Sequence, residues 1–159
     1  MNGADHNMIC SVFCYNISMK LFVKKLDEKV TGIIPYAHDT DAGLDVCCSS
    51  DIELLPNIPT KVGTGVAMQV PDGYVALVWD KSSVGSMGIK TFGGVIDSGY
   101  RGEVFIVMVN LTSEKINFQS GKKIAQIIIQ KYEKMDVEYV ESLDDATTRG
   151  DKGFGSSGQ

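Results

Sequence analysis

Histidine and net positive charge are both in short supply in this 159-residue sequence, and each shortage argues against a class of function. Fifteen Lys and Arg residues against 20 Asp and Glu residues give a formal net charge of −5. That balance argues against a DNA- or RNA-binding protein that gains affinity by neutralising phosphates. The two histidines and four cysteines lack the repeated spacing of a structural zinc site.

Cysteine and long apolar runs are scarce as well. Four cysteines, without the dense spacing of a small disulfide-stapled domain, suit a reducing compartment. No stretch approaches the roughly 20 apolar residues of a membrane-spanning helix. We therefore expect a cytoplasmic protein with neither a nucleic-acid nor a membrane partner, and nuclear access stays open for a eukaryotic or viral source.

Several common catalytic motifs are also missing. The sequence has no Gly-x-x-x-x-Gly-Lys-Ser/Thr phosphate loop, no His-Glu-x-x-His metal site and no Gly-x-Ser-x-Gly nucleophile turn. A carboxylate is therefore expected to perform any acid–base chemistry, and Asp97 is the best candidate because glycines and two apolar residues surround it. A desolvated aspartate can act as a base toward water, whereas the alternative is a turn aspartate that caps its own backbone.

Short runs of β-branched and aliphatic residues alternate with Gly, Pro, Asp and Asn between residues 19 and 139, which predicts an all-β protein. The expected strands cover residues 20–26, 61–70, 74–79, 104–111, 115–118, 123–132 and 137–140. Only residues 82–87 favour a helix, with Ser82 or Ser83 as its N-cap. Because strands do not alternate with helices, a Rossmann-type nucleotide fold is not expected.

The C-terminal stretch, residues 144–159, contains a single large apolar side chain, Phe154, and cannot pack as an independent element. One interpretation is a frayed, mobile terminus. The other gives the segment a ligand, because Arg149 supplies a cation, Phe154 a stacking face and a serine pair hydroxyl groups on a glycine-rich backbone. That combination suits a nucleotide with its phosphates.

Five separate stretches of the sequence resemble, in order, the five motifs of the trimeric dUTPase family, the dUTP diphosphatases. They are DAGLDV at 41–46, DKSSVGSMG at 80–88, GGVIDSGYRGE at 93–103, GKKIAQI at 121–127 and RGDKGFGSSG at 149–158. The resemblance leaves residues 1–18 outside it as an N-terminal extension. One such motif alone is weak evidence for the family, whereas five in the right order are strong evidence.

The resemblance implies a jelly-roll-like β-sandwich that assembles as a homotrimer, with each active site shared between subunits. It implies a β domain at 19–143, followed by a flexible, Gly/Ser-rich tail at 144–159 that closes over the active site. The implied reaction is hydrolysis of dUTP to dUMP and pyrophosphate, which keeps uracil out of DNA and supplies dUMP for thymidylate synthesis. In that reaction Asp97 activates the water that attacks the α-phosphorus.

The resemblance also implies roles for the binding residues. Asp45 is expected to hold the water shell of a Mg²⁺ ion on the phosphates. Tyr100 is expected to pack under the deoxyribose, and Phe154 to stack on the uracil. The backbone of a hairpin reads the uracil edge, and its base-binding residues are Thr91, Gly93, Gly94, Val95 and Ile96. The phosphate-binding residues are Lys81, Ser82, Ser83, Gln126, Arg149, Gly155, Ser156 and Ser157.

The match departs from the family at two points, and two other functions stay open. Lys81 stands where the family usually has arginine, and an ammonium group binds phosphate without the bidentate fork of a guanidinium. Thr91 and Phe92 are also unusual for the hairpin.

A dCTP deaminase of the same fold needs a glutamate on the following strand, where this sequence has Val107. The other alternative is a nucleotide-binding regulator that keeps the fold without hydrolysis.

Overall fold

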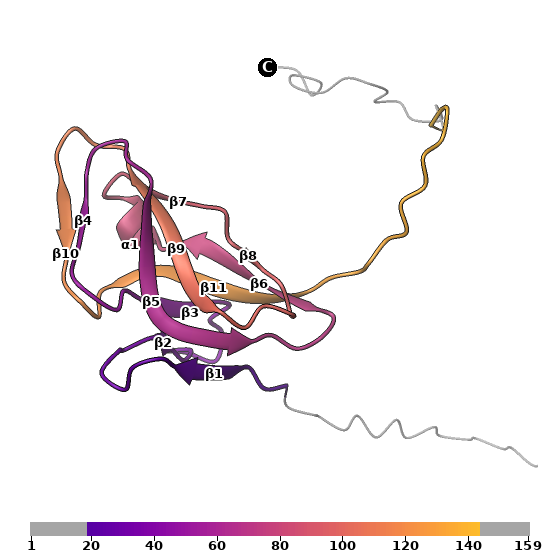
Figure 1. The fold of residues 1–159 in the computed structure, drawn as a ribbon, viewed down its shortest axis with the longest axis horizontal. Helices are drawn as coiled ribbons and strands as arrows, with labels where there is room; N and C mark the ends of the chain where they lie inside the picture. The colour runs from indigo at the N-terminus through magenta and orange to yellow at the C-terminus, as the bar shows by residue number, and fades with distance from the viewer. Residues whose placement is uncertain (1–18, 144–159) are drawn as a thin grey trace, which may run out of the picture.

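The computed structural model describes residues 19–143, and two β-sheets enclose its core (Figure 1). The first sheet contains, in spatial order, β1 (Phe22–Lys25), β5 (Thr60–Gln69), β9 (Glu103–Asn110) and β7 (Ile89–Phe92). The second contains β2 (Ile33–Ile34), β3 (Leu44–Cys47), β11 (Lys123–Lys131), β6 (Tyr74–Asp80) and β8 (Val95–Ile96). A smaller pair joins β10 (Ile116–Phe118) to β4 (Ile52–Leu54). Paired strands run antiparallel, and the all-β sandwich predicted from the sequence is confirmed.

Both larger sheets contribute apolar side chains to one buried cluster. Val62 and Met108 enter it from the first sheet, Val46 and Ile127 from the second, and Leu54 from the small pair. Along β9, alternate residues are buried at its start, as expected for a strand with one face on the core. Burial of this apolar surface is the main stabilising contribution to the sandwich.

Two buried polar side chains form hydrogen bonds with the main chain of other segments. The amide of Asn110, at the end of β9, donates to the main-chain oxygens of Leu54 at 3.0 Å and Glu114 at 2.7 Å. The hydroxyl of Thr64 donates to the main-chain oxygen of Val104 at 2.7 Å. Between residues 19 and 143, no buried side-chain nitrogen or oxygen lacks a hydrogen-bond partner. The interior therefore carries no desolvation penalty from unpaired side chains.

Six of the seven predicted strands are present, but the prediction of a strand at 137–140 is wrong. The chain after β11 forms no strand up to residue 143, and Figure 1 shows it leaving the sandwich. Val137 and Tyr139 in that segment are 80% and 95% exposed, so apolar alternation there meets no partner strand within the described chain. The strands that were not predicted, β2, β3, β4, β7 and β8, are only two to four residues long and too short to show a pattern.

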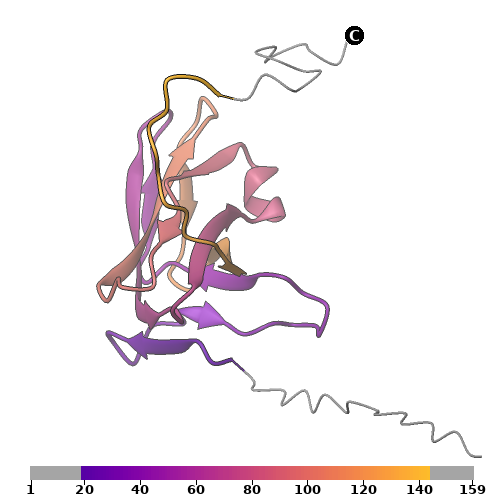
Figure 2. The ribbon, with the colours of Figure 1, turned by 90° about the vertical axis from the view of Figure 1, so that its right-hand side faces the viewer.

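The predicted helix is shorter than expected and is capped differently. Helix α1 covers Ser82–Gly85, and Lys81 occupies its N-cap position without a side-chain hydrogen bond, so the prediction of a serine cap is wrong. Val84 is buried and holds the turn against the core, while α1 itself stands at the margin of the sandwich (Figure 2). None of the helices in this part of the chain has the length and apolar character needed to span a membrane.

We expect Leu54→Ala and Leu55→Ala to differ sharply in stability, although the two leucines are neighbours. Leu54 is 0% exposed and Leu55 is 46% exposed. Truncation of the buried leucine should lower the free energy of unfolding by about 2–5 kcal/mol, because it removes apolar contacts and leaves a cavity. The exposed leucine should change it by about 0.5 kcal/mol or less. Urea unfolding at one protein concentration measures both, and equal losses would contradict the packing described here.

Candidate active site

Four of the polar side chains near the ends of β3, β6 and β11 form one cluster, because β11 pairs with β3 on one edge and with β6 on the other. The Lys81 ammonium lies 2.7 Å from Oδ1 of Asp45, and the Lys123 ammonium lies 2.7 Å from its Oδ2. Gln126 is the cross-strand partner of Asp45, and its Nε2 donates to the main-chain oxygen of Asp80 at 2.9 Å. The predicted residues Asp45, Lys81 and Gln126 are therefore brought together.

The cluster holds its carboxylate in the ionised form. Burial alone would raise the pKa of Asp45, but hydrogen bonds from Lys123 and Lys81 outweigh it, and the pKa lies below its usual value. The same hydrogen bond to Asp45 raises the pKa of Lys123. Two ammonium groups around one carboxylate leave this corner of an acidic protein with a net positive charge, which suits a phosphate ligand.

Glycine in the first of the five stretches makes room for this cluster. A Cβ atom on Gly43 would lie 2.6 Å from Oε1 of Gln126, closer than carbon and oxygen can approach. Any larger residue at position 43 would therefore displace the Gln126 side chain. Ser82 and Ser83, the next predicted phosphate-binding residues, are both exposed at the start of α1, directly after Lys81.

Lys123 is a member of the cluster that the sequence did not indicate. It lies three positions before Gln126, and in a regular strand that spacing points two side chains to opposite faces. The pairing of β11 with β3 shifts register between Lys123 and Ala125, which is a β-bulge. The bulge lets Lys123 reach the same carboxylate as Lys81, and the only hint in the sequence is its place within the stretch 121–127.

The predicted base-binding segment lines a pocket of about 260 Å³ with the end of β6. The pocket walls include Thr91, Gly93, Gly94 and Val95. The segment is not a hairpin, because β7 pairs with β9 in one sheet and β8 pairs with β6 in the other. It is a crossing between the sheets, and the prediction of a hairpin is corrected on this point.

Gly94 allows the crossing to approach β6 closely. Its carbonyl oxygen accepts a hydrogen bond from the Val78 N–H at 2.8 Å, and its φ of +105° is a conformation that favours glycine. A Cβ atom there would lie 3.0 Å from the carbonyl oxygen of Val78. The backbone of this segment is thus fixed against the strand.

Asp97 and Tyr100 lie together in a neighbouring pocket of about 310 Å³, which Ile96 also lines. The Tyr100 hydroxyl donates to the main-chain oxygen of Glu103 at 2.8 Å, which holds its ring over the turn. Asp97 is exposed in the single chain, so the predicted desolvation is not provided by the described residues alone. Val78, Gly94 and Val95 belong to the walls of both pockets, so the two adjoin.

The chain builds two groups of site residues and does not join them within one pocket. The walls of the two adjoining pockets include none of Asp45, Lys81, Lys123 and Gln126. The remaining predicted residues lie outside the described part of the chain; they are Arg149, Phe154, Gly155, Ser156 and Ser157.

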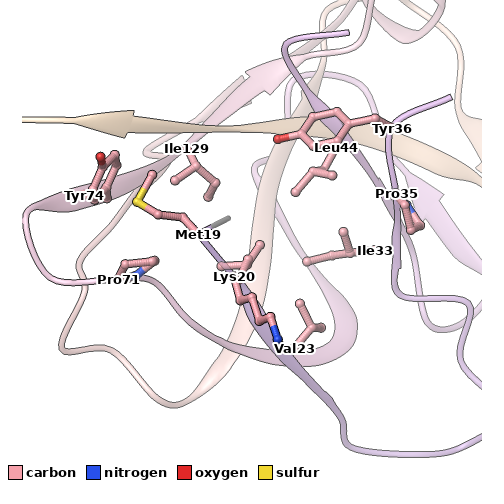
Figure 3. A pocket seen from close by; sticks show the side chains of 11 residues that line it. Met19, Lys20, Val23, Ile33, Pro35, Tyr36, Leu44, Pro71, Tyr74 and Ile129 are labelled. Carbon is pink, nitrogen blue, oxygen red and sulfur yellow. The ribbon is translucent and has the colours of Figure 1, made fainter. Parts of the chain in front are cut away.

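A pocket larger than either of these two lies elsewhere in the described residues. It measures about 500 Å³ and is lined mostly by apolar side chains from the N-terminal segment, the β2 region and β11, among them Val23, Ile33, Tyr36 and Ile129 (Figure 3). None of the predicted site residues lines it. Size alone therefore does not mark the site in this molecule.

Within residues 19–143, no group of three or more His, Cys, Asp and Glu side chains is arranged to hold a metal ion. Asp45 is instead a single carboxylate beside two cations. Mg²⁺ binds through one or two carboxylates together with substrate phosphates and keeps several of its waters. The donor set therefore fits an ion that arrives on phosphate oxygens and touches Asp45 through water.

Comparison with known proteins gives consistent results. The dUTPase family matches residues 29–158. A deoxyuridine 5'-triphosphate nucleotidohydrolase of Rhodococcus erythropolis is 40% identical over 144 residues, which cover 88% of this chain and 87% of that protein. A mutant dUTPase of Staphylococcus bacteriophage 80alpha, solved with dUpNHpp, is 29% identical with a TM-score of 0.79, over 88% of this chain and 99% of its own. A mutant dUTPase of phage phi11 of S. aureus, solved to show the coordination of a structural Mg(II) ion, is 26% identical with a TM-score of 0.72, over 78% of this chain and 98% of its own.

Replacing Asp45 with Asn should destabilise the protein at neutral pH and have little effect in acid. The native pKa of Asp45 is lowered, so its ionised form stabilises the fold above the unfolded pKa of about 3.9, and that contribution is lost as the pH falls through the native pKa. Because both lysine partners are partly exposed, we expect a difference of at most about 1 kcal/mol. Urea unfolding between about pH 5 and pH 2 measures it. A difference that stays constant over that range would contradict the ion pairs, and Asp72→Asn, an exposed turn residue, is the control.

Proposed function

The chain belongs to the dUTPase family and hydrolyses dUTP, and we propose that Asp97 activates the attacking water. The observation that carries this proposal is the pair of adjoining pockets, one with Asp97 and Tyr100 and one with the base-binding segment. A uracil held in the second pocket would direct its sugar and α-phosphate toward Asp97. The water then loses a proton to the carboxylate while its oxygen attacks the α-phosphorus, and the bond to the bridging oxygen breaks to release dUMP and pyrophosphate.

Selection of uracil is assigned to the backbone of residues 93–96. Amide and carbonyl groups that are fixed against β6 can pair with the uracil edge, and a cytosine would leave one of them unpaired at a cost of about 1–3 kcal/mol. The close approach of Gly94 to Val78 fixes this backbone, and we assign to it the exclusion of the methyl group of thymine. Tyr100, held over the turn by its bond to Glu103, would pack under the deoxyribose and exclude a 2′-hydroxyl.

The phosphate chain is assigned to the lysine cluster, which consists of Asp45, Lys81, Lys123 and Gln126. Lys81, Ser82, Ser83 and Gln126 would bind the phosphates, as the sequence predicts, and we add Lys123 because its ammonium stands beside Asp45 at 2.7 Å. These cations would stabilise the charge that develops on the leaving pyrophosphate. Asp45 would hold the water shell of Mg²⁺, which neutralises phosphate charge when it is bound. The C-terminal residues Arg149, Phe154, Gly155, Ser156 and Ser157 would complete the contacts.

We assign the assembly as a homotrimer with shared sites. Support comes from the pocket walls, because no residue of the lysine cluster lines the pocket of Asp97 and a second copy could bring the two groups together. Apolar side chains of the segment after β11 give further support, because Met135, Val137 and Leu143 are 77%, 80% and 81% exposed in the single chain. Strand β1 is also an end strand of its sheet. An open strand edge can pair with another chain, and exposed apolar surface often marks an interface between proteins.

Removal of dUTP would keep uracil out of DNA, and the dUMP formed would supply thymidylate synthesis. The division into an extension at 1–18, a domain at 19–143 and a closing tail at 144–159 stays a prediction. The cytoplasmic location and the lack of a nucleic-acid or membrane partner also stay predictions.

Asp97→Asn should lower kcat for dUTP by about 10²- to 10⁴-fold, because it removes the proton acceptor and keeps the shape of the side chain. The parent protein should release pyrophosphate from dUTP with Mg²⁺ and leave dTTP, dCTP and UTP nearly untouched. Asp72→Asn, on an exposed turn, is the matched control and should retain full activity. Full activity in Asp97→Asn would contradict the assignment of the base.

Two further measurements on the parent protein separate the alternatives. Release of ammonia from dCTP would indicate a deaminase, and binding of a non-hydrolysable dUTP analogue without turnover of dUTP would indicate a regulator. Either result in the parent protein would overturn the proposed function.

Mixing two inactive variants tests whether the site is shared. One copy carries Asp97→Asn, and the other carries both Lys81→Ala and Lys123→Ala. If these residues act across subunits, each site takes Asp97 from one copy and the lysines from another. Random reassembly after mild denaturation should then restore activity at about a quarter of the sites, because about half of the copies retain each group. If every site lies within one chain, the mixture should stay as inactive as its components. Sedimentation of the parent protein should show a trimer, and a monomer would contradict a shared site.

A further inference from the structure

One carboxylate without a role in the proposed reaction, Asp80, contacts both groups of site residues. Its Oδ1 accepts hydrogen bonds from the Thr91 N–H at 2.9 Å and from the Thr91 hydroxyl at 2.7 Å. Its other oxygen forms an ion pair with the Lys90 ammonium. Its own main-chain oxygen accepts the bond from Gln126, and Lys81 follows it in the chain. The end of β6 is therefore tied to the base-binding segment and to the lysine cluster through one residue.

The base-binding segment is held by β6 at a second point. The Val78 N–H donates to the carbonyl oxygen of Gly94 at 2.8 Å. Gly93 lies between the two anchor points, Thr91 and Gly94, with a φ of +71°. Because Val78 and Asp80 are two positions apart on a strand, a single rigid element fixes both ends of the turn that faces the base. The pocket wall includes Asp80 and Lys90 as well as the segment itself.

The bonds from Thr91 to Asp80 are charge-assisted. Burial alone would raise the pKa of Asp80, but hydrogen bonds from Lys90 and Thr91 outweigh it and lower the pKa below its usual value. An ionised acceptor makes shorter and stronger hydrogen bonds than a neutral one. Lys90 lies on the outer side of the contact with a half-exposed side chain and balances the charge of the carboxylate.

We propose that Asp80 is a positioning residue for pyrimidine selection, which fixes the distance of Thr91 from β6 and therefore the width of the base pocket. The proposal rests on the proposed function, because it assigns the pocket to uracil. Backbone groups discriminate between bases only where they are held in place, since a turn that can shift would admit a methyl group or pair with a different base edge. Loss of the Asp80 carboxylate should therefore reduce the preference for dUTP more than it reduces kcat.

The test is a comparison of kcat and KM for dUTP, dTTP and dCTP in the parent protein and Asp80→Ala. We expect kcat/KM for dUTP to fall by about 10- to 100-fold, mainly through KM, because two hydrogen bonds to an ionised carboxylate are lost. The preference for dUTP over dTTP and dCTP should fall by at least about tenfold, while kcat for dUTP changes by less than about threefold. Asp97→Asn should show the opposite split, with kcat reduced and the preference for dUTP retained.

Three variants separate positioning from a general loss of stability. Asp80→Asn keeps an oxygen that can accept from Thr91 and should retain most of the preference. Lys90→Met removes only the ion pair and should have a smaller effect than Asp80→Ala. Glu53→Ala removes the ion pair with Lys115, at 2.8 Å on the paired strands β4 and β10, which line neither of the two site pockets, and is the matched control that should leave all constants unchanged.

The outcomes are distinguishable. A parent protein that does not hydrolyse dUTP would overturn the proposed function and this proposal with it. A selective parent protein together with an equally selective, folded Asp80→Ala would overturn only the role of Asp80. If Asp80→Ala does not fold, Thr91→Val decides, because it removes one of the two bonds to Asp80 and should still lower the preference for dUTP. An unchanged preference in Thr91→Val would then overturn the proposal.

Discussion

The position of β11 between β3 and β6 is the constraint on which the lysine cluster depends. Backbone pairing on both edges of β11 sets Gln126 opposite Asp45 and Ala125 opposite Asp80, so residues from three distant parts of the sequence meet. Regular alternation would point Lys123 away from Asp45. The bulge after Lys123 directs its side chain toward that carboxylate instead. The charge of the cluster is therefore a product of backbone register, and a slip of one residue would remove it.

The sequence predicted the long strands because apolar residues repeat along them with the period of a strand whose face packs on a core, as in β9. It also indicated Asp45, Lys81 and Gln126 through their motifs, and the structure brings these three together. It could not predict Lys123, whose orientation depends on the bulge, or the crossing of residues 91–96 between sheets, which depends on pairing with distant strands. The segment at 137–140 shows the reverse case, since its apolar pattern has no partner strand in the described chain.

The exposure of Asp97 gives the single chain an incomplete environment for the proposed chemistry. A general base works best where water other than the reactant is excluded, and the described residues leave this carboxylate open to solvent. The backbone around it is nevertheless already formed, because Tyr100 is bonded to Glu103 and Gly94 to Val78. The base and sugar side of the proposed site is thus formed within one chain, and its enclosure is assigned to the proposed assembly.

The contact between Gly43 and Gln126 has a consequence for mutational tolerance. Gly43 carries no functional group, yet even a methyl group at this position would occupy the space of the Gln126 amide. The lack of a reactive group at Gly43 would therefore be a poor guide to its importance. In a selection for activity, replacements at position 43 should be poorly tolerated, because they would displace the Gln126 amide from its bond to Asp80.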